Sequence, residues 1–228
     1  MVYSDCKAKV LQSIFFGGNN MNNTTEIVFI IDASGSMHGL EADTIGGFNA
    51  TVAKQREVEG NALVTTVLFA DEAKTVHDRI PLSDVPLMTK EDYRVGGCTA
   101  LLDAVGEGIA KFELIHKYAR KEDVPARTIF VITTDGMENA SRRYNGDTVK
   151  RMVERKREEG WEFIFLAANI DAALTAECMG IGRERAANYR QDKKGVGACY
   201  AAMSAAISAF RSEEGIDGST WKETLAKE

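Results

Sequence analysis

The chain contains the stretch Ile27-Val28-Phe29-Ile30-Ile31, followed directly by Asp32-Ala33-Ser34-Gly35-Ser36-Met37. The first part is short, β-branched and uninterrupted, which predicts a buried strand. A carboxylate and two hydroxyls then occupy alternate positions, 32, 34 and 36, of the loop that leaves this strand. In open α/β sheets, ligands bind in the crevice outside the carboxyl ends of the strands. Side chains that offer only oxygen suit a hard cation such as Mg²⁺ or Mn²⁺ better than zinc.

Two further segments extend this pattern. Arg127–Thr134 is a second apolar run that predicts a buried strand, and it ends at Asp135-Gly136. Between the two strands, Gly96-Gly97-Cys98-Thr99 precedes a long amphipathic pattern that starts at Ala100. We therefore expect five side chains from three loops to converge on one ion: Asp32, Ser34, Ser36, Thr99 and Asp135.

This set resembles the metal-ion-dependent adhesion site of the von Willebrand factor A family, written DxSxS…T…D, and the resemblance extends over roughly Thr25 to Arg211. It implies that the two serines and Thr99 touch the metal ion directly, whereas Asp32 and Asp135 act mainly through bound water. A carboxylate from a partner would take the remaining position. Neutral hydroxyl ligands leave the ion electrophilic, and Mg²⁺ commonly keeps exchangeable positions.

Each of these residues also has an ordinary structural interpretation. Ser34, Ser36 or Thr99 could cap a following helix, and Asp135-Gly136 is a common turn dipeptide. The complete set in this order favours the metal site. Without a metal ion, Asp32 and Asp135 would place two negative charges in one cleft, which raises the pKa of one of them.

The alternation of strand and helix patterns predicts βαβ units and a mostly parallel sheet. We expect an α/β fold: a Rossmann-like three-layer α/β/α sandwich with one antiparallel edge strand, as in the von Willebrand A fold. The edge strand follows from the tight connection between the strands at 62–69 and 75–80, which only an antiparallel hairpin allows. The other expected elements are helices at 41–57, from 100, at 150–159, at 172–179 and over 196–210, and strands at 161–170 and 187–189.

Composition is consistent with one domain in a chain of 228 residues. We predict an N-terminal extension at 1–22, with Met21 as the native start, a domain at 23–212 and a polar C-terminal tail at 213–228 with Trp221 as its one possible anchor. The net charge of −6 argues against nucleic acid or an anionic membrane as the main partner. The four cysteines, Cys6, Cys98, Cys178 and Cys199, show no CxxC spacing, which favours reduced thiols and a cytoplasmic location.

Two classes of function compete. The first is a metal-dependent protein-binding module, and the resemblance implies a stand-alone intracellular prokaryotic type whose partner is an AAA+ ATPase or a stress-related complex. The rim of its site would include His38, Glu138, Asn139, Arg142 and Arg143. The alternative is a Mg²⁺-dependent hydrolase or phosphotransferase. In the haloacid-dehalogenase phosphatases, a second Asp follows the first by two residues, but Ser34 stands there. Because the chain also lacks a P-loop and a nucleophile elbow, we predict no catalytic residues.

Overall fold

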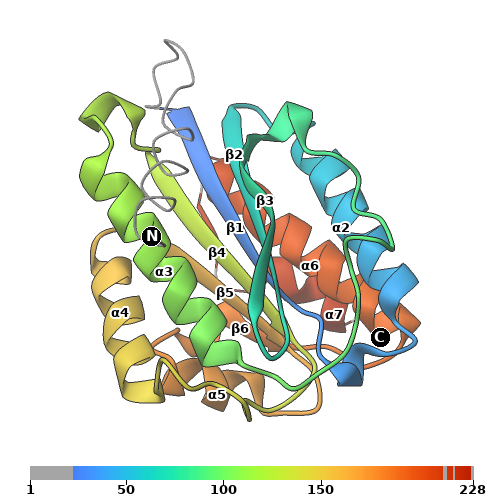
Figure 1. Cartoon of the computed structure of the whole chain (residues 1–228). Coiled ribbons are helices and arrows are strands. Elements are labelled where there is room, and N and C mark those ends of the chain that lie inside the picture. The colour runs from blue at the N-terminus through green and yellow to red at the C-terminus, as the bar shows by residue number, and fades with distance from the viewer. Residues whose placement is uncertain (1–22, 213–214, 218, 227–228) are drawn as a thin grey trace.

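The computed structural model describes residues 23–212, 215–217 and 219–226, so the predicted extension at 1–22 lies outside the described residues. The described strands form one six-stranded sheet in the order β3-β2-β1-β4-β5-β6 (Figure 1). All neighbouring strands are parallel except β2 and β3, which pair antiparallel at the edge, as expected. The strands are β1 (Thr24–Asp32), β2 (Asn61–Phe69), β3 (Ala73–Pro81), β4 (Arg127–Thr134), β5 (Glu162–Ala167) and β6 (Ala186–Asn188).

Helices cover both faces of this sheet, which confirms the predicted three-layer α/β/α fold (Figure 1). One face is covered by α2 (Glu41–Gln55) and α6 (Lys193–Arg211). The other is covered by α3 (Leu101–Tyr118), α4 (Gly146–Glu158) and α5 (Ala172–Cys178). All nine residues of β1 are buried, because a central parallel strand has packing partners on both faces.

Some boundaries differ from the sequence prediction. The strand at 161–170 is shorter than expected, because the chain leaves the sheet after Ala167 and Asn169 adopts a left-handed backbone with φ of 57°. Helix α4 begins before the charged run at 150–159, because Asn145 caps it by accepting a hydrogen bond from the backbone N–H of Thr148 at 2.9 Å. These shifts of a few residues leave the order of elements unchanged.

The described residues after α6 contact the core and the edge strand β6. A 3₁₀ turn at Thr220–Lys222 and the short helix α7 (Glu223–Ala226) follow. Trp221 is only 2 % exposed and belongs to the core cluster between the sheet and the α2–α6 layer. The Lys222 ammonium donates to the carbonyl of Ala186 in β6 at 2.7 Å. Trp221 is therefore an anchor for this segment, as its apolar character indicated.

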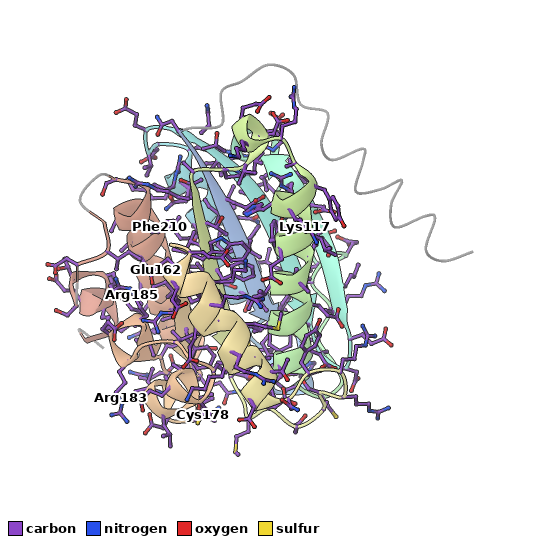
Figure 2. The ribbon with its side chains drawn as sticks, turned by 90° about the vertical axis from the view of Figure 1, so that its left-hand side faces the viewer. Lys117, Glu162, Cys178, Arg183, Arg185 and Phe210 are labelled. Atoms are coloured by element: carbon purple, nitrogen blue, oxygen red, sulfur yellow. The ribbon has the colours of Figure 1, made fainter. Side chains whose placement is uncertain are left out.

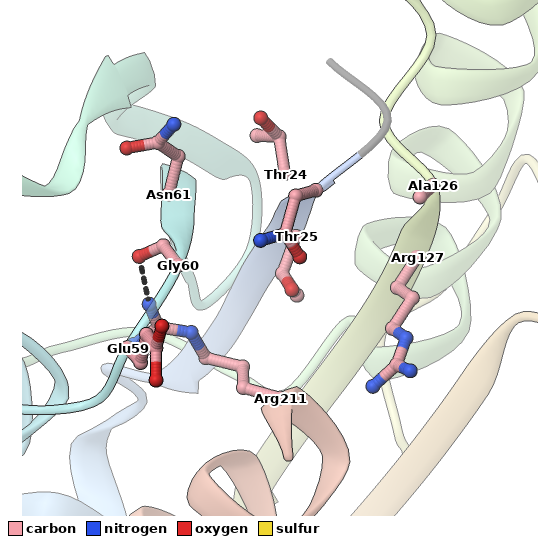
Figure 3. Close-up of a pocket in the computed structure, with 9 residues that line it drawn as sticks. Thr24, Thr25, Glu59, Gly60, Asn61, Ala126, Arg127 and Arg211 are labelled. Carbon is pink, nitrogen blue, oxygen red and sulfur yellow. Dashed lines mark hydrogen bonds between the residues drawn. The ribbon is translucent and has the colours of Figure 1, made fainter. Parts of the chain in front are cut away.

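Arginines join the elements at the edge where the parallel strands begin. Arg211, the last residue of α6, donates to the carbonyl of Gly60 at 2.7 Å (Figure 3). Arg127 donates to the carbonyl of Phe210 at 2.8 Å. Arg185 similarly contacts Glu162 at 3.0 Å and connects the starts of β5 and β6 (Figure 2). The first two contacts satisfy backbone carbonyls, and the third pairs two opposite charges. A search of the described residues finds no helix with the length and apolarity needed to span a bilayer.

Candidate metal centre

Three hydrogen bonds hold the Asp32 carboxylate at the end of β1. One carboxylate oxygen accepts the backbone N–H of Ser34 at 2.7 Å, and the other accepts the hydroxyl of Thr134 at 2.6 Å. The backbone N–H of Asp135 lies 3.4 Å from that second oxygen. Because β1 and β4 are parallel neighbours with Ile31 opposite Thr133, the ends of the two strands bring Asp32 and Asp135 together.

The two serine hydroxyls lie next to each other, and one of them contacts Asp135. Ser34 Oγ lies 3.0 Å from Ser36 Oγ, and Ser36 Oγ donates to Asp135 Oδ1 at 2.5 Å. Ser34 is 1 % exposed, whereas Ser36 is exposed to solvent. The hydroxyl pair therefore runs from the buried floor of the site to its open surface.

Thr99 enters from the third loop. Its backbone is fixed by Asn139, which accepts the Thr99 N–H at 2.9 Å and donates its own N–H to the Thr99 carbonyl at 3.0 Å. A Cβ atom placed on Gly136 would lie 3.9 Å from Thr99 Oγ1 and 3.7 Å from Ser36 Oγ, so the two hydroxyls flank the same glycine. The structure thus brings all five predicted side chains to one edge of the sheet.

The ordinary interpretations of these hydroxyls are not what the structure shows. Ser34 precedes the 3₁₀ turn at Gly35–Met37, yet its side chain makes no capping hydrogen bond. The residue that precedes α3 is Ala100, not Thr99, and the first backbone N–H groups of this helix, those of Leu102 and Asp103, donate to the side chains of Glu138 and Ser141. The three hydroxyl oxygens are therefore not engaged as helix caps.

The two carboxylates lack a positive neighbour. Asp32 and Asp135 are each 1 % exposed, and no lysine, arginine or histidine of the described residues forms an ion pair with either of them. Burial raises the pKa of Asp135 above its usual value, and the charge of Asp32 adds to this, whereas hydrogen bonds from Ser36 and Gln191 act in the opposite direction. The crowding of the two acids was expected from the sequence.

The donor set is chemically specific. In the described part of the chain, no group of three or more His, Cys, Asp or Glu side chains is arranged to hold a metal ion. The candidate site instead combines two carboxylates with three hydroxyls, all of them oxygen donors. Such donors fit a hard divalent cation, because Mg²⁺ and Mn²⁺ prefer oxygen ligands and zinc prefers nitrogen and sulfur.

Sequence reasoning missed several residues that support the site. The hydroxyl of the buried Tyr93 donates to the Asp32 carbonyl at 2.6 Å, and that of Tyr189 donates to the Thr134 carbonyl at 3.2 Å. Gln191 Nε2 donates to Asp135 Oδ2 at 2.6 Å. These contacts join residues 55 to 61 positions apart in the chain, so no local motif could have indicated them.

The predicted rim residues differ in availability. His38 is exposed and its Nδ1 lies 3.2 Å from a Glu41 carboxylate oxygen. Glu138 is occupied, because its carboxylate accepts the backbone N–H groups of Leu102, Ala140 and Ser141. Arg143 is exposed and pairs with Glu107, and Arg142 is also exposed. Beside them Met137 is 72 % exposed, which makes it the most exposed large apolar side chain among the described residues.

No protein-family model matches this sequence, and neither does any of the curated proteins compared with it. Solved structures do match. They include proximal thread matrix protein 1 from the mussel byssus (14 % identity, TM-score 0.53, covering 78 % of this chain and 44 % of that one). A von Willebrand factor type A protein from Catenulispora acidiphila also matches (14 % identity, TM-score 0.53, covering 82 % of this chain and 43 % of that one). So does the manganese-loaded TRAP protein of Plasmodium vivax (14 % identity, TM-score 0.53, covering 78 % of this chain and 72 % of that one).

These similarities establish the fold. The six-stranded, mostly parallel sheet with one antiparallel edge strand has the von Willebrand A architecture that the sequence predicted. The chain spans less than half the length of the mussel and Catenulispora proteins. One further crystal structure of the mussel protein is described as having a zinc-occupied metal-ion-dependent adhesion site, at 14 % identity and a TM-score of 0.50.

Proposed function

We propose that this protein is a metal-dependent protein-binding module. One divalent ion, Mg²⁺ or Mn²⁺, binds at a complete metal-ion-dependent adhesion site, and the bound ion captures an aspartate or glutamate of a partner protein. The observation that carries this proposal is the pair of buried acids, Asp32 and Asp135, which lie beside three hydroxyls without a cationic side chain. Two buried carboxylates that no positive group compensates are unfavourable unless a cation joins them.

The five side chains divide into two kinds. Ser34, Ser36 and Thr99 would supply neutral oxygens to the ion, and Asp32 and Asp135 would hold its water and balance its charge. The ion would supply Lewis acidity toward an incoming carboxylate. Because the hydroxyl ligands carry no charge, they leave the ion free to attract an anionic side chain. The manganese-loaded and zinc-occupied structures of proteins with this fold support divalent binding at such a site.

Calorimetry tests the metal site. We expect one Mn²⁺ or Mg²⁺ per chain, with binding lost in Asp32→Ala. The matched control is Asp84→Ala, which removes the same charge from an exposed residue beyond the end of β3, at the opposite edge of the sheet. Equal binding by wild type and Asp32→Ala would contradict the proposed site.

Affinity capture tests the partner. The immobilised wild-type protein is incubated with native lysate in Mn²⁺ or in EDTA, beside Asp32→Ala in Mn²⁺. We expect one or more proteins to be retained only by wild type with metal, and we propose an AAA+ ATPase or a component of a stress-related complex among them. Replacement of a partner's contacting acid by its amide should abolish retention. A retained set that is identical in all three conditions would contradict metal-bridged binding.

A further inference from the structure

One amide side chain links the loops that form the metal centre. Gln191 lies in the loop between β6 and α6, and its Nε2 donates to Asp135 Oδ2 at 2.6 Å and to the Ser36 carbonyl at 3.0 Å. Its Oε1 accepts a hydrogen bond from Asn169 Nδ2 at 2.6 Å. A single side chain therefore connects the loops after β1, β4, β5 and β6.

Asn169 holds this amide from the other side. Its Nδ2 also donates to the backbone carbonyl of Asp135 at 3.1 Å, so it contacts both Gln191 and the residue that Gln191 orients. The backbone of Asn169 is left-handed, with φ of 57°, a conformation that asparagine tolerates better than most residues. This turn at the end of β5 is what directs the Asn169 side chain to the site.

The backbone on both sides of Gln191 is held in place by hydrogen bonds and close packing. Tyr189 is 8 % exposed and its backbone N–H donates to the Ala167 carbonyl at 2.9 Å. Asp192 caps α6 by accepting the backbone N–H of Gly195 at 2.8 Å. Gly195 is packed so closely that a Cβ there would lie 2.0 Å from the Arg190 carbonyl oxygen. The loop between β6 and α6 is therefore fixed, although the Gln191 side chain is exposed.

We propose that Gln191 is a positioning residue of the metal centre, an inference that rests on the proposed function. With Ser36 on Oδ1 and Gln191 on Oδ2, both oxygens of Asp135 are oriented by neutral donors. A lysine or arginine at this position would also orient the acid, but its charge would compensate the carboxylates and weaken the attraction for a cation. An amide orients Asp135 and leaves the negative charge of the site available.

Three variants test this role by Mn²⁺ calorimetry. Gln191→Met keeps the length of the side chain and removes the amide, and we expect it to weaken Mn²⁺ binding about 10- to 100-fold, as loss of outer-shell partners does elsewhere. Asn169→Gly removes the second amide without backbone strain, because glycine accepts positive φ, and we expect a smaller loss. Leu174→Ala is the neutral control, since Leu174 is 53 % exposed on the neighbouring helix α5, and we expect no change.

Thermal unfolding separates positioning from general stability. If Gln191 only stabilised the fold, its substitution would lower the melting temperature equally in EDTA and in Mn²⁺. Substitution of a positioning residue reduces the increase in melting temperature that Mn²⁺ produces, because that increase depends on the ion's affinity for the folded state. We expect Gln191→Met to reduce this increase and to stay close to wild type in EDTA. An unchanged increase would overturn the inference.

Paramagnetic broadening supplies a direct signature. Mn²⁺ should broaden the side-chain amide signals of Gln191 and Asn169 in the wild-type protein. The Gln55 amide should keep its signal, because it donates to the Ser204 carbonyl at the far end of α2. Broadening of Gln55 alone would overturn the inference. If wild type binds Mn²⁺ and Gln191→Met binds it equally well, only the inference on Gln191 fails. If wild type binds no Mn²⁺, the proposed function fails as well.

Discussion

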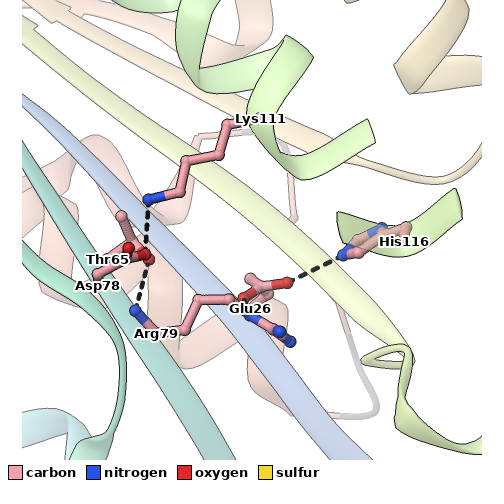
Figure 4. Close-up of polar contacts among 6 residues, drawn as sticks. All are labelled: Glu26, Thr65, Asp78, Arg79, Lys111 and His116. Atoms are coloured by element: carbon pink, nitrogen blue, oxygen red, sulfur yellow. Dashed lines mark hydrogen bonds and ion pairs between the residues drawn. The ribbon is translucent and has the colours of Figure 1, made fainter. Parts of the chain in front are cut away.

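The strand β1 carries a buried acid near each end, and the two are treated in opposite ways. Glu26, at the beginning of the strand, is fully buried and contacts the Arg79 guanidinium, with Nε at 2.6 Å, and the His116 ring, with Nε2 at 2.9 Å (Figure 4). Asp32, at its end, is 1 % exposed and accepts hydrogen bonds from neutral donors: the Thr134 hydroxyl and the backbone N–H groups of Ser34 and Asp135. The nearby Asp135 likewise has neutral donors only.

This difference indicates where the molecule can accept a cation. At the Glu26 end, the protein supplies the positive charge itself, and the Arg79 backbone N–H is additionally fixed by the Thr65 hydroxyl at 3.0 Å. At the Asp32 end, the same fold provides oxygen atoms and no positive charge. Removal of one member of a compensated buried pair leaves an isolated charge, which costs about 3–5 kcal/mol. Removal of one of two uncompensated acids relieves a repulsion instead.

The largest expected effect comes from substituting acid by amide at the two ends. In EDTA, Glu26→Gln should destabilise the protein by about 3–5 kcal/mol, because Arg79 then lacks its buried carboxylate. Asp135→Asn should change the free energy of unfolding by less than about 1 kcal/mol, because the new amide can keep its oxygen on Gln191 Nε2 and donate to the Ser36 hydroxyl, which rotates to accept. Urea unfolding monitored by circular dichroism measures both.

The order of these two values is the critical point. Equal destabilisation by Glu26→Gln and Asp135→Asn would mean that Asp135 is compensated within the protein, and the contrast between the ends would be wrong. Arg79→Met is the complementary control, because it isolates Glu26 from its closest cationic partner. We expect it to be destabilising as well, since His116 alone then faces the carboxylate.

Metal addition should sharpen the contrast next. At a Mn²⁺ concentration about 100 times its dissociation constant, wild type should gain about 2.7 kcal/mol of stability, and EDTA should reverse the gain. Asp32→Ala should lose it, whereas Glu26→Gln, although less stable, should keep it, because the substitution lies at the far end of β1. Differential scanning calorimetry with and without metal measures this. A gain that Asp32→Ala retains would place the ion elsewhere.

Much of the site at the Asp32 end of β1 could be predicted from the sequence, because its residues directly follow the ends of strands. Asp32 and Asp135 each come directly after an apolar run, and parallel strands present those ends at one edge. Gln191 and Asn169 could not be predicted, since each belongs to the site only through contacts made after folding. Glu26 is an intermediate case.

Glu26 was visible as the one charged residue inside the run of β1, and a buried charge requires a partner. Its partners lie 53 and 90 positions along the chain, and nothing in their local sequence indicates the pairing. Arg79 even adopts a positive φ of 49°, which residue type alone does not predict. The sequence therefore indicates the need for compensation, and only the fold shows how it is met.

The hydroxyl ligands should contribute less than the acids. Thr99→Ala should weaken Mn²⁺ binding about tenfold, which corresponds to about 1.4 kcal/mol, and leave unfolding in EDTA close to wild type. Thr99→Ser should restore most of the affinity, because it returns the oxygen without the methyl group. Calorimetric titration of the three proteins decides this. Equal affinity in all three would exclude Thr99 from the site while leaving the acid pair as the cation site.

The smallest effect concerns His77, a buried histidine that has no acid in contact. His77 is 2 % exposed, its Nδ1 lies 3.0 Å from the Thr66 hydroxyl, and its ring stacks on Phe48. Burial lowers the pKa of His77, and the charge of Asp92 opposes this only in part. Because the folded state disfavours the protonated ring, the stabilisation is present above the unfolded pKa of about 6.5 and is lost as the pH falls below it.

Urea unfolding of wild type and His77→Gln between pH 7.5 and 5 measures this contribution. We expect the stability of wild type to fall on acidification more steeply than that of His77→Gln, by at most about 1.4 kcal/mol per pH unit. Parallel pH profiles for wild type and His77→Gln would show that the burial of His77 does not contribute to the acid sensitivity.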